Sequence, residues 1–164
     1  MKRRETVPSE MIRPPFFMKE GGTISSDNCI FQEDILYQNG FGTEGDYPWQ
    51  EPRTAVATLY KNWKEVGEPQ ITSCFKERNR EKARPKMICY LACFIQAMTW
   101  AEGRPVLSLK NIEMDVASTP YAPMNSKERL SFILETIDHH QSFIALQQLF
   151  DEANKKWAVY FMKS

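Results

Sequence analysis

The spacing of apolar residues changes along the chain, and this change separates an irregular beginning from a helical remainder. Residues 1–50 are interrupted repeatedly by Gly and Pro, and residues 27–38 alone show a partial helical spacing of apolar positions. From residue 51 onward, apolar residues recur every three or four positions, which is typical of one buried helix face. We therefore predict an all-α fold, in which an irregular N-terminal quarter (residues 1–50) packs as a strap on a helical bundle of residues 51–164 to form one compact domain.

The first helices of this bundle are indicated by their start and stop residues. Pro52 suits the first position of a helix, where its missing N–H is not needed, and Gly67 is expected to end that helix. Its apolar face consists of four residues at helical spacing: Val56, Leu59, Tyr60 and Trp63. A more polar helix is predicted over residues 69–82, and Pro85 is predicted to open a third.

Residues 85–102 are predicted to form the central helix of the domain. The stretch PKMICYLACFIQAMTWAEG is apolar on nearly all sides, with Gln96 and Thr99 as its polar positions between Met87 and Ala101. A helix without a polar face has to be covered on most sides by other elements. We therefore expect five or six helices in total, arranged around this segment.

The last third of the chain predicts two helices that follow a loop. Residues 104–125 are expected to form the loop. Capping boxes are expected at the two helix starts: Asn125 with Glu128, and Asp138 with Gln141. Apolar residues before and after residues 138–142 fall on faces about half a turn apart. A break near residues 138–140 would resolve this difference, and the alternative is one long helix between different neighbours.

Length and charge limit the roles open to this chain. It has 164 residues, of which 42% are hydrophobic, and Lys+Arg and Asp+Glu each number 21. A formal net charge of zero gives no overall field that would attract nucleic acid or an anionic membrane. The basic start MKRR is not followed by the apolar run of a signal peptide, and residues 87–101 are too few to cross a bilayer. We therefore expect a cytoplasmic protein without a membrane segment.

No residue pattern names a reaction, so an enzymatic function has no positive support, and no catalytic residue, cofactor or metal site is assigned. Phosphate-binding loops and a G-x-S-x-G nucleophile motif are absent from the sequence. Cys89 and Cys93 lie in the most apolar segment, so we expect reduced thiols buried in the core. The adjacent His139 and His140 would point about 100° apart on a helix, so we expect them at a helix terminus or turn.

The basic stretch KERNREKARPK, residues 76–86, is one candidate binding surface. It contains six Lys or Arg residues and two Glu residues. An accessory nucleic-acid-binding protein would contact phosphates through four of these: Arg78, Arg80, Lys82 and Arg84. Helical spacing distributes the charge over two stripes, however, so the competing interpretation is a solvated helix face with ion pairs.

The stretch VPSEMIRPPFFMKE, residues 7–20, is the second candidate. Pro14 and Pro15 are expected to hold its backbone extended, and its apolar side chains include Phe16 and Phe17. Burial of one such side chain contributes about 1.5–3 kcal/mol, whereas ordering one residue costs about 1–2 kcal/mol. Docking in a groove of the same chain is therefore favoured, because no translational entropy is lost, over binding to a partner protein and over disorder.

Aromatic residues in the irregular segments are the candidate contacts of an adaptor protein. They are Phe16, Phe17, Phe41, Tyr47 and Trp49. The competing interpretation is that all of them pack on the helices of their own chain. With either interpretation, a non-enzymatic protein–protein interaction module is the function that the sequence favours, and its oligomeric state is open.

Short motifs also resemble those of a known family. The segments VPSEM and PPFF near the start, Pro48-Trp49 and Trp63-Lys64 are similar to those of the YpoC-like family of small Gram-positive bacterial proteins. The resemblance implies a small cytoplasmic protein without an assigned activity, and it supplies no catalytic residues to transfer.

Overall fold

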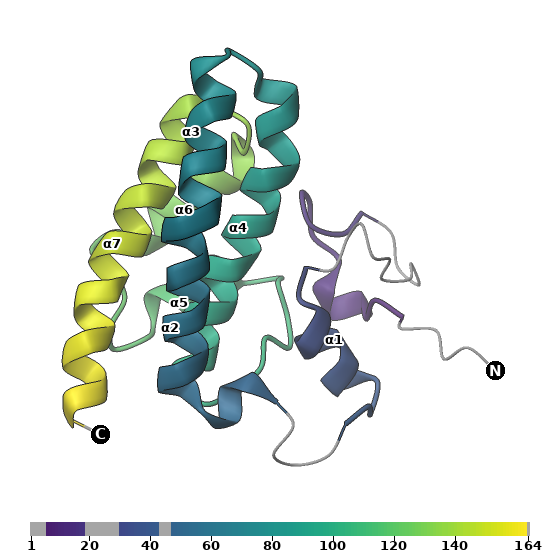
Figure 1. The fold of residues 1–164 in the computed structure, drawn as a ribbon. Coiled ribbons are helices and arrows are strands. Elements are labelled where there is room, and N and C mark those ends of the chain that lie inside the picture. The colour runs from purple at the N-terminus through teal and green to yellow at the C-terminus, as the bar shows by residue number, and fades with distance from the viewer. Residues whose placement is uncertain (1–5, 19–29, 43–46, 164) are drawn as a thin grey trace.

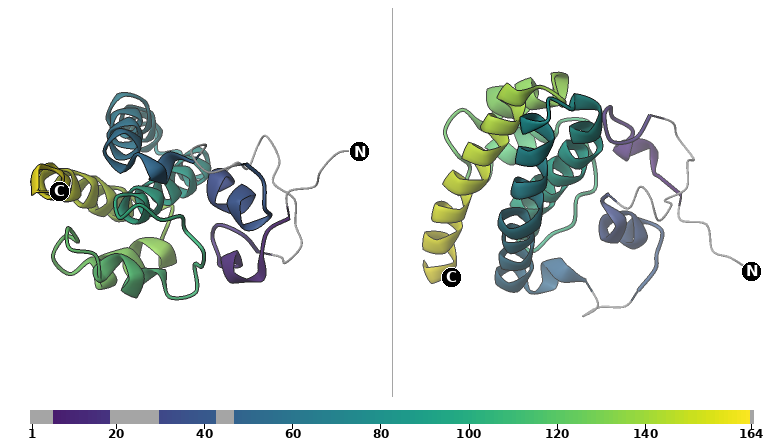
Figure 2. Two further views of the ribbon diagram at one scale, coloured as in Figure 1. Left: turned by 90° about the horizontal axis from the view of Figure 1, so that it is seen from below. Right: turned by 45° about the horizontal axis from the view of Figure 1, so that its top comes forward.

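The computed structural model describes residues 6–18, 30–42 and 47–163, and within these ranges the chain is helical and contains no β-strand (Figure 1). The predicted all-α class is therefore confirmed. The α-helices are α1 (Gln32–Gln38), α2 (Pro52–Asn62), α3 (Glu68–Lys76), α4 (Arg80–Trp100), α5 (Ile112–Ala117), α6 (Ser126–Glu135) and α7 (His140–Lys163). In two further views, α4 lies in the middle, with α7 on one side and α1 with the N-terminal segment on the other (Figure 2).

The central position predicted for the apolar segment is confirmed by the burial of α4. Five large apolar residues of this helix have no solvent exposure: Met87, Leu91, Phe94, Ile95 and Met98. The helix nevertheless begins earlier than predicted, because the Asn79 side chain accepts a hydrogen bond from the backbone N–H of Lys82 at 3.0 Å and caps it at Arg80. Pro85 therefore lies inside the helix instead of opening it. Gly103, with φ +80°, follows its end.

The predicted stop at Gly67 is wrong, because the chain continues from α2 into α3 through a π-helical turn, Trp63–Gly67. Gly67 serves close packing instead. A Cβ atom at this position would lie 2.6–2.8 Å from ring atoms of Tyr90 on α4, closer than any normal contact. The second predicted helix is also too long, since α3 ends at Lys76 and Arg78 takes a left-handed φ of 54° in the turn before α4.

The predicted break in the last third of the chain is confirmed, since α6 ends at Glu135 and α7 begins at His140. Two local predictions were wrong. Residues 104–125 are not loop throughout, because α5 lies within them. Asn125 forms no side-chain cap, because its backbone has a left-handed φ of 58°. Asp138, predicted to cap the last helix, lies two residues before α7, and its side chain forms an ion pair with Arg80 at the start of α4, at 3.2 Å.

Residues 6–18 lie against α1 and the connection that leads into α5. The backbone N–H of Leu109 donates to the Glu10 carbonyl at 2.9 Å, and the Arg13 guanidinium binds both carboxylate oxygens of Glu113. The prediction of an extended backbone at Pro14 and Pro15 is wrong. The chain turns there, because the N–H groups of the next two residues both donate to the Arg13 carbonyl. This turn brings both following phenylalanines to the interior. Of the predicted helix 27–38, residues 27–29 lie outside the described ranges, and α1 covers the remainder from Gln32.

Candidate functional site

A groove with a volume of about 550 Å³ lies between α1, α2, α4 and the 3₁₀ turn η2 (Pro48–Gln50). Its apolar walls are formed by Ile30, Pro48, Ala55, Leu59, Ala92 and Trp100. Polar groups from α1, α2 and α4 reach the same space, among them Glu33, Thr58 and Gln96. A concave surface of this size, mostly apolar with a few convergent polar groups, is typical of a binding site.

The charged groups that line the groove are both carboxylates, Glu33 of α1 and Glu51 at the start of α2. Neither forms an ion pair with another residue in the part of the chain that the structure describes. The Glu33 carboxylate accepts a hydrogen bond from the Gln96 amide at 3.4 Å. The groove therefore presents negative charge that is not neutralised locally, and it favours a ligand with a cationic group beside an apolar one.

Asp34 of α1 lies behind the groove and holds two of its lining residues, Gln96 and Trp100, in place. Its side chain has no solvent exposure and accepts hydrogen bonds from the Gln96 amide at 2.8 Å and from the Trp100 indole at 2.9 Å. It also accepts one from the backbone N–H of Val106, at 2.6 Å. Burial disfavours the charged carboxylate and raises the pKa of Asp34 to about 7, although the three hydrogen bonds oppose this shift. A single buried carboxyl group thus joins α1, α4 and the connection after α4.

Two thiols of α4, Cys89 and Cys93, also line the groove. The prediction that both would be buried in the core was wrong, because both are half-buried on the face of α4 that borders the groove. A hydrogen bond from Cys93 lowers the pKa of Cys89 to about 7; burial opposes this shift, and the nearby Lys86 ammonium supports it. Cys74 is buried and free, and Cys29 lies outside the described residues.

The aromatic residues predicted to contact a partner pack within the chain. The rings of Tyr47 and Trp49 are stacked with centroids 4.7 Å apart, and Trp49, only 4% exposed, lies against Trp100. Phe41 is half-buried, and its carbonyl accepts a hydrogen bond from the Tyr47 hydroxyl.

Phe16 and Phe17, also predicted as contacts, are 4% and 6% exposed, and both lie next to Phe31. The groove is thus more accessible than these aromatic side chains. None of the predicted aromatic residues lines it, and they pack against other residues of the chain.

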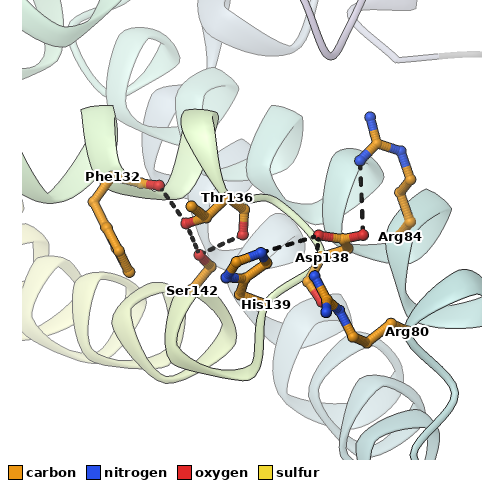
Figure 3. Close-up of polar contacts among 7 residues, drawn as sticks. All are labelled: Arg80, Arg84, Phe132, Thr136, Asp138, His139 and Ser142. Carbon is orange, nitrogen blue, oxygen red and sulfur yellow. Dashed lines mark hydrogen bonds and ion pairs between the residues drawn. The ribbon is translucent and has the colours of Figure 1, made fainter.

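The basic candidates are divided between different environments (Figure 3). Arg80 and Arg84 of α4 both face the Asp138 carboxylate, at 3.2 Å and 4.0 Å, and His139 lies beside it at 3.8 Å. Partial burial alone would raise the pKa of Asp138, but the hydrogen bond and charge of Arg80 hold it below its ordinary value. Arg78 lies in the turn between α3 and α4, and Lys82 is exposed on α4.

Polar contacts also hold the turn that presents Asp138. The Thr136 hydroxyl donates to the Phe132 carbonyl at 2.7 Å, and the Ser142 hydroxyl donates to the Thr136 carbonyl at 2.6 Å (Figure 3). These bonds satisfy backbone groups at the end of α6 and the start of α7, so the break between the two helices is structurally defined. The adjacent histidines occupy this turn and the first position of α7, as predicted. Within residues 6–18, 30–42 and 47–163, no group of three or more His, Cys, Asp or Glu side chains is arranged to hold a metal ion.

The comparisons with known proteins place this helical domain in a family. A family model described as "YpoC-like protein" matches residues 53–164, and the chain belongs to the YpoC-like family. One relative is the "Uncharacterized protein YpoC" of Bacillus subtilis (strain 168), which is 29% identical over 117 residues, or 71% of each chain. No solved structure matches the chain. None of the described helices has the length and apolar character that crossing a membrane requires.

The family expected from short motifs is confirmed, although most of those motifs lie outside the matched residues. Of the quoted motifs, the match includes Trp63-Lys64, whereas the segments near the start and Pro48-Trp49 precede it. The matched region begins in α2 and covers all later helices. The groove therefore combines residues of the matched region, from α2 and α4, with Ile30, Glu33 and Glu51, which precede it.

Sequence reasoning did not identify the groove, Glu33, Glu51 or the two thiols as a site. One signal was present, because Asp34 occupies a position of helical spacing between apolar residues, where a carboxylate has to be paired or protonated. The groove itself depends on how α1 approaches α4, and helical periodicity carries no information about that distance.

Proposed function

We propose that this protein is a non-enzymatic adaptor of the cytoplasm, and that the groove between α1, α2 and α4 binds a short segment of a partner protein. The segment that fits has one or two apolar side chains next to a Lys or Arg residue. The apolar side chains would occupy the space lined by Ala55, Leu59 and Ala92, and the cation would lie near Glu33 and Glu51. Charge complementarity of this kind provides specificity and accelerates association.

The observation that supports this proposal is the coincidence of an apolar groove with two carboxylates that have no ion-pair partner among the described residues. A carboxylate beside apolar surface loses part of its hydration, so a matching cation is favoured over water. The Asp34 hydrogen bonds hold α1 against α4 before any ligand binds. A groove formed in advance lowers the entropic cost of binding.

Selection of displayed random peptides on the purified full-length chain tests the proposal. We expect the selected peptides to share an apolar residue beside Lys or Arg. Thr58 is exposed and lines the groove, so Thr58→Trp should fill it and reduce binding of these peptides at least tenfold. Ala57→Trp is the matched control, because Ala57 is exposed on the same helix but outside the groove. Selected peptides without a basic residue, or equal loss in both variants, would contradict the proposal.

The alternative of an accessory nucleic-acid-binding protein receives less support. Arg80 and Arg84 already neutralise Asp138, so two of the four candidate phosphate contacts would have to exchange partners. A salt titration of DNA and RNA binding by the wild type and by Arg78→Ala/Lys82→Ala decides this alternative. Binding that falls steeply with salt and weakens in the double variant would favour it over the adaptor.

A further inference from the structure

The two thiols of α4 form a pair inside the groove. Cys89 and Cys93 are one helical turn apart, line the same space and are joined by a hydrogen bond between their side chains. Cys74, by contrast, is buried and lies outside the groove. The space next to the pair, about 550 Å³, is large enough for a small organic reagent to approach either sulfur. A small reagent in the groove can therefore reach this pair, whereas most thiols in a protein core cannot be reached from solvent.

Charged and titratable groups around Cys89 favour its thiolate. The hydrogen bond from Cys93 is the largest contribution that lowers the pKa of Cys89 to about 7, and Lys86 on the same helix acts in the same direction. Tyr90 is the neighbouring titratable group of α4, and its pKa is raised by burial and by the two cysteines, so it stays neutral near pH 7. The carboxylates of Glu33 on α1 and Glu51, just before α2, also line the groove; their negative charge acts against a thiolate, but neither is among the groups that shift the pKa of Cys89.

The spacing of the pair prevents the usual second step of thiol chemistry. Residues four apart on a helix have Cβ atoms about 5–6 Å apart, whereas a disulfide needs about 3.5–4.5 Å. Cys93 therefore cannot displace a group from Cys89 without unwinding α4. A mixed disulfide formed on Cys89 would be the end of the reaction until an external thiol removes it.

We propose that Cys89 is a site of reversible thiolation by small disulfides that enter the groove. The Cys89 sulfur, its proton already lost to water, attacks one sulfur of a disulfide RS–SR. A Cys89–S–S–R bond forms, the S–S bond of the reagent breaks, and RS⁻ leaves and takes a proton from water. Because Glu33 and Glu51 line the groove, a cationic amino disulfide should react faster than an anionic carboxylate disulfide. This inference stands independently of the adaptor function.

The test uses the full chain with Cys29→Ser, so that three thiols remain. Cystamine serves as the cationic probe and dithiodiglycolate as the anionic probe, and mass spectrometry of peptides identifies the modified residue. We expect the first adduct on Cys89, with cystamine reacting several times faster. The rate should rise with pH to a midpoint near 7 rather than at the value of an ordinary thiol, about 8.5. A first adduct on Cys74 or Cys93, no adduct, or a midpoint near 8.5 would overturn the proposal.

Variants of Cys93 separate the role of the hydrogen bond from that of access. Cys93→Ala removes the donor, and at pH 7 the rate at Cys89 should fall about threefold, since a smaller thiolate fraction is partly offset by a more nucleophilic sulfur. Cys93→Ser keeps a donor and should react at nearly the wild-type rate. Equal rates in Cys93→Ala and the wild type, with the same pH midpoint, would contradict the assigned role of Cys93.

Discussion

The Asp34 carboxylate accepts a hydrogen bond from the indole N–H of Trp100, with 2.9 Å between Oδ1 and Nε1. The bond joins the short helix α1 to the last residue of the central helix α4, across 66 positions of the sequence. Trp100 also lines the groove, so the same contact that anchors α1 shapes the proposed binding surface. The stability of α1 on the bundle and the integrity of the groove should therefore depend on one buried carboxyl group.

The contribution of Asp34 to the free energy of unfolding should decrease as the pH rises from about 4 to about 7. Its pKa is raised from the ordinary value of 3.8 to about 7 in the folded chain, so the unfolded chain releases this proton first. The contribution of Asp34 is thus most favourable below pH 4, declines through this window and is constant above it. Three pKa units correspond to about 4 kcal/mol. Urea unfolding across pH 4–8 gives the free energy of unfolding of the wild type and of Asp34→Asn. The difference between these two free energies should change by about this amount over the pH range.

A control with the opposite sign is available at Glu113. Burial alone would raise the pKa of this carboxyl group, but the hydrogen bonds from Arg13 outweigh it and lower the pKa. Its stabilising contribution is therefore present above the ordinary pKa of Glu and is lost as the pH falls. With measurements extended below pH 4, the free energy of unfolding of the wild type relative to Glu113→Gln should decrease as the pH falls below about 4.5, whereas that relative to Asp34→Asn should increase as the pH falls from about 7 to about 4. Parallel pH profiles for the two variants would refute this assignment of the titrating groups.

Phe16→Ala should lower the free energy of unfolding by about 3–5 kcal/mol, because it removes a buried ring. This ring contacts the Phe31 ring edge to face, with 5.2 Å between the ring centroids. Met18→Ala is the matched control in the same segment, since Met18 is 70% exposed, and it should change stability by less than about 0.5 kcal/mol. Chemical denaturation measures both. Equal, small effects would mean that residues 6–18 do not function as a strap on the helical body.

Gly67→Ala should destabilise the protein, although Ala is the better helix former by about 1 kcal/mol. The added methyl group would meet the Tyr90 ring at 2.6–2.8 Å, and overpacking of this kind costs about 1–3 kcal/mol. In a Tyr90→Ala background the same substitution should be neutral or stabilising. Denaturation of the four proteins of this cycle gives the coupling, and a loss of equal size in both backgrounds would show that the ring is not the cause.

Glu51→Lys should weaken binding of the selected basic peptides by about tenfold or more, because it replaces an attractive charge in the groove by a repulsive one. Glu65→Lys makes the same change in net charge at an exposed position outside the groove, and it should leave the affinity within about twofold. Isothermal titration at two salt concentrations measures both. If the two variants lose the same affinity, the effect is due to net charge and not to the groove.

Periodicity was sufficient to predict the helical class, the central helix α4 and the break before α7, because each depends on which residues are apolar. Helix boundaries were predicted less well where a tertiary contact decides them. Gly67 was interpreted as a stop, yet it is retained within a continuous helical path because Tyr90 requires the space. The start of α4 at Arg80 depends instead on a local contact, because the Asn79 side chain caps the helix, and the prediction placed the start at Pro85.

The candidate site was predictable to a smaller extent. Phe16 and Trp49 were named as candidate partner contacts, with packing inside their own chain as the competing interpretation, and both side chains are buried in the structure. Cys89 and Cys93 were assigned to the core because their helix is apolar on all sides, but local hydropathy does not reveal that α1 and α2 leave part of one face open. Asp34, which follows Glu33 and lies between apolar residues at helical spacing, was a sequence feature in the region of the proposed groove.

The most direct test is an NMR titration of the isotope-labelled full chain with a peptide selected for binding. We expect the largest amide shift changes on residues that line the groove from α2 and α4, such as Ala55, Thr58, Ala92 and Gln96. These changes should be lost in Thr58→Trp and kept in Ala57→Trp. Shift changes centred on residues 76–86 or at the α6–α7 turn, with the groove unaffected, would contradict binding in the groove.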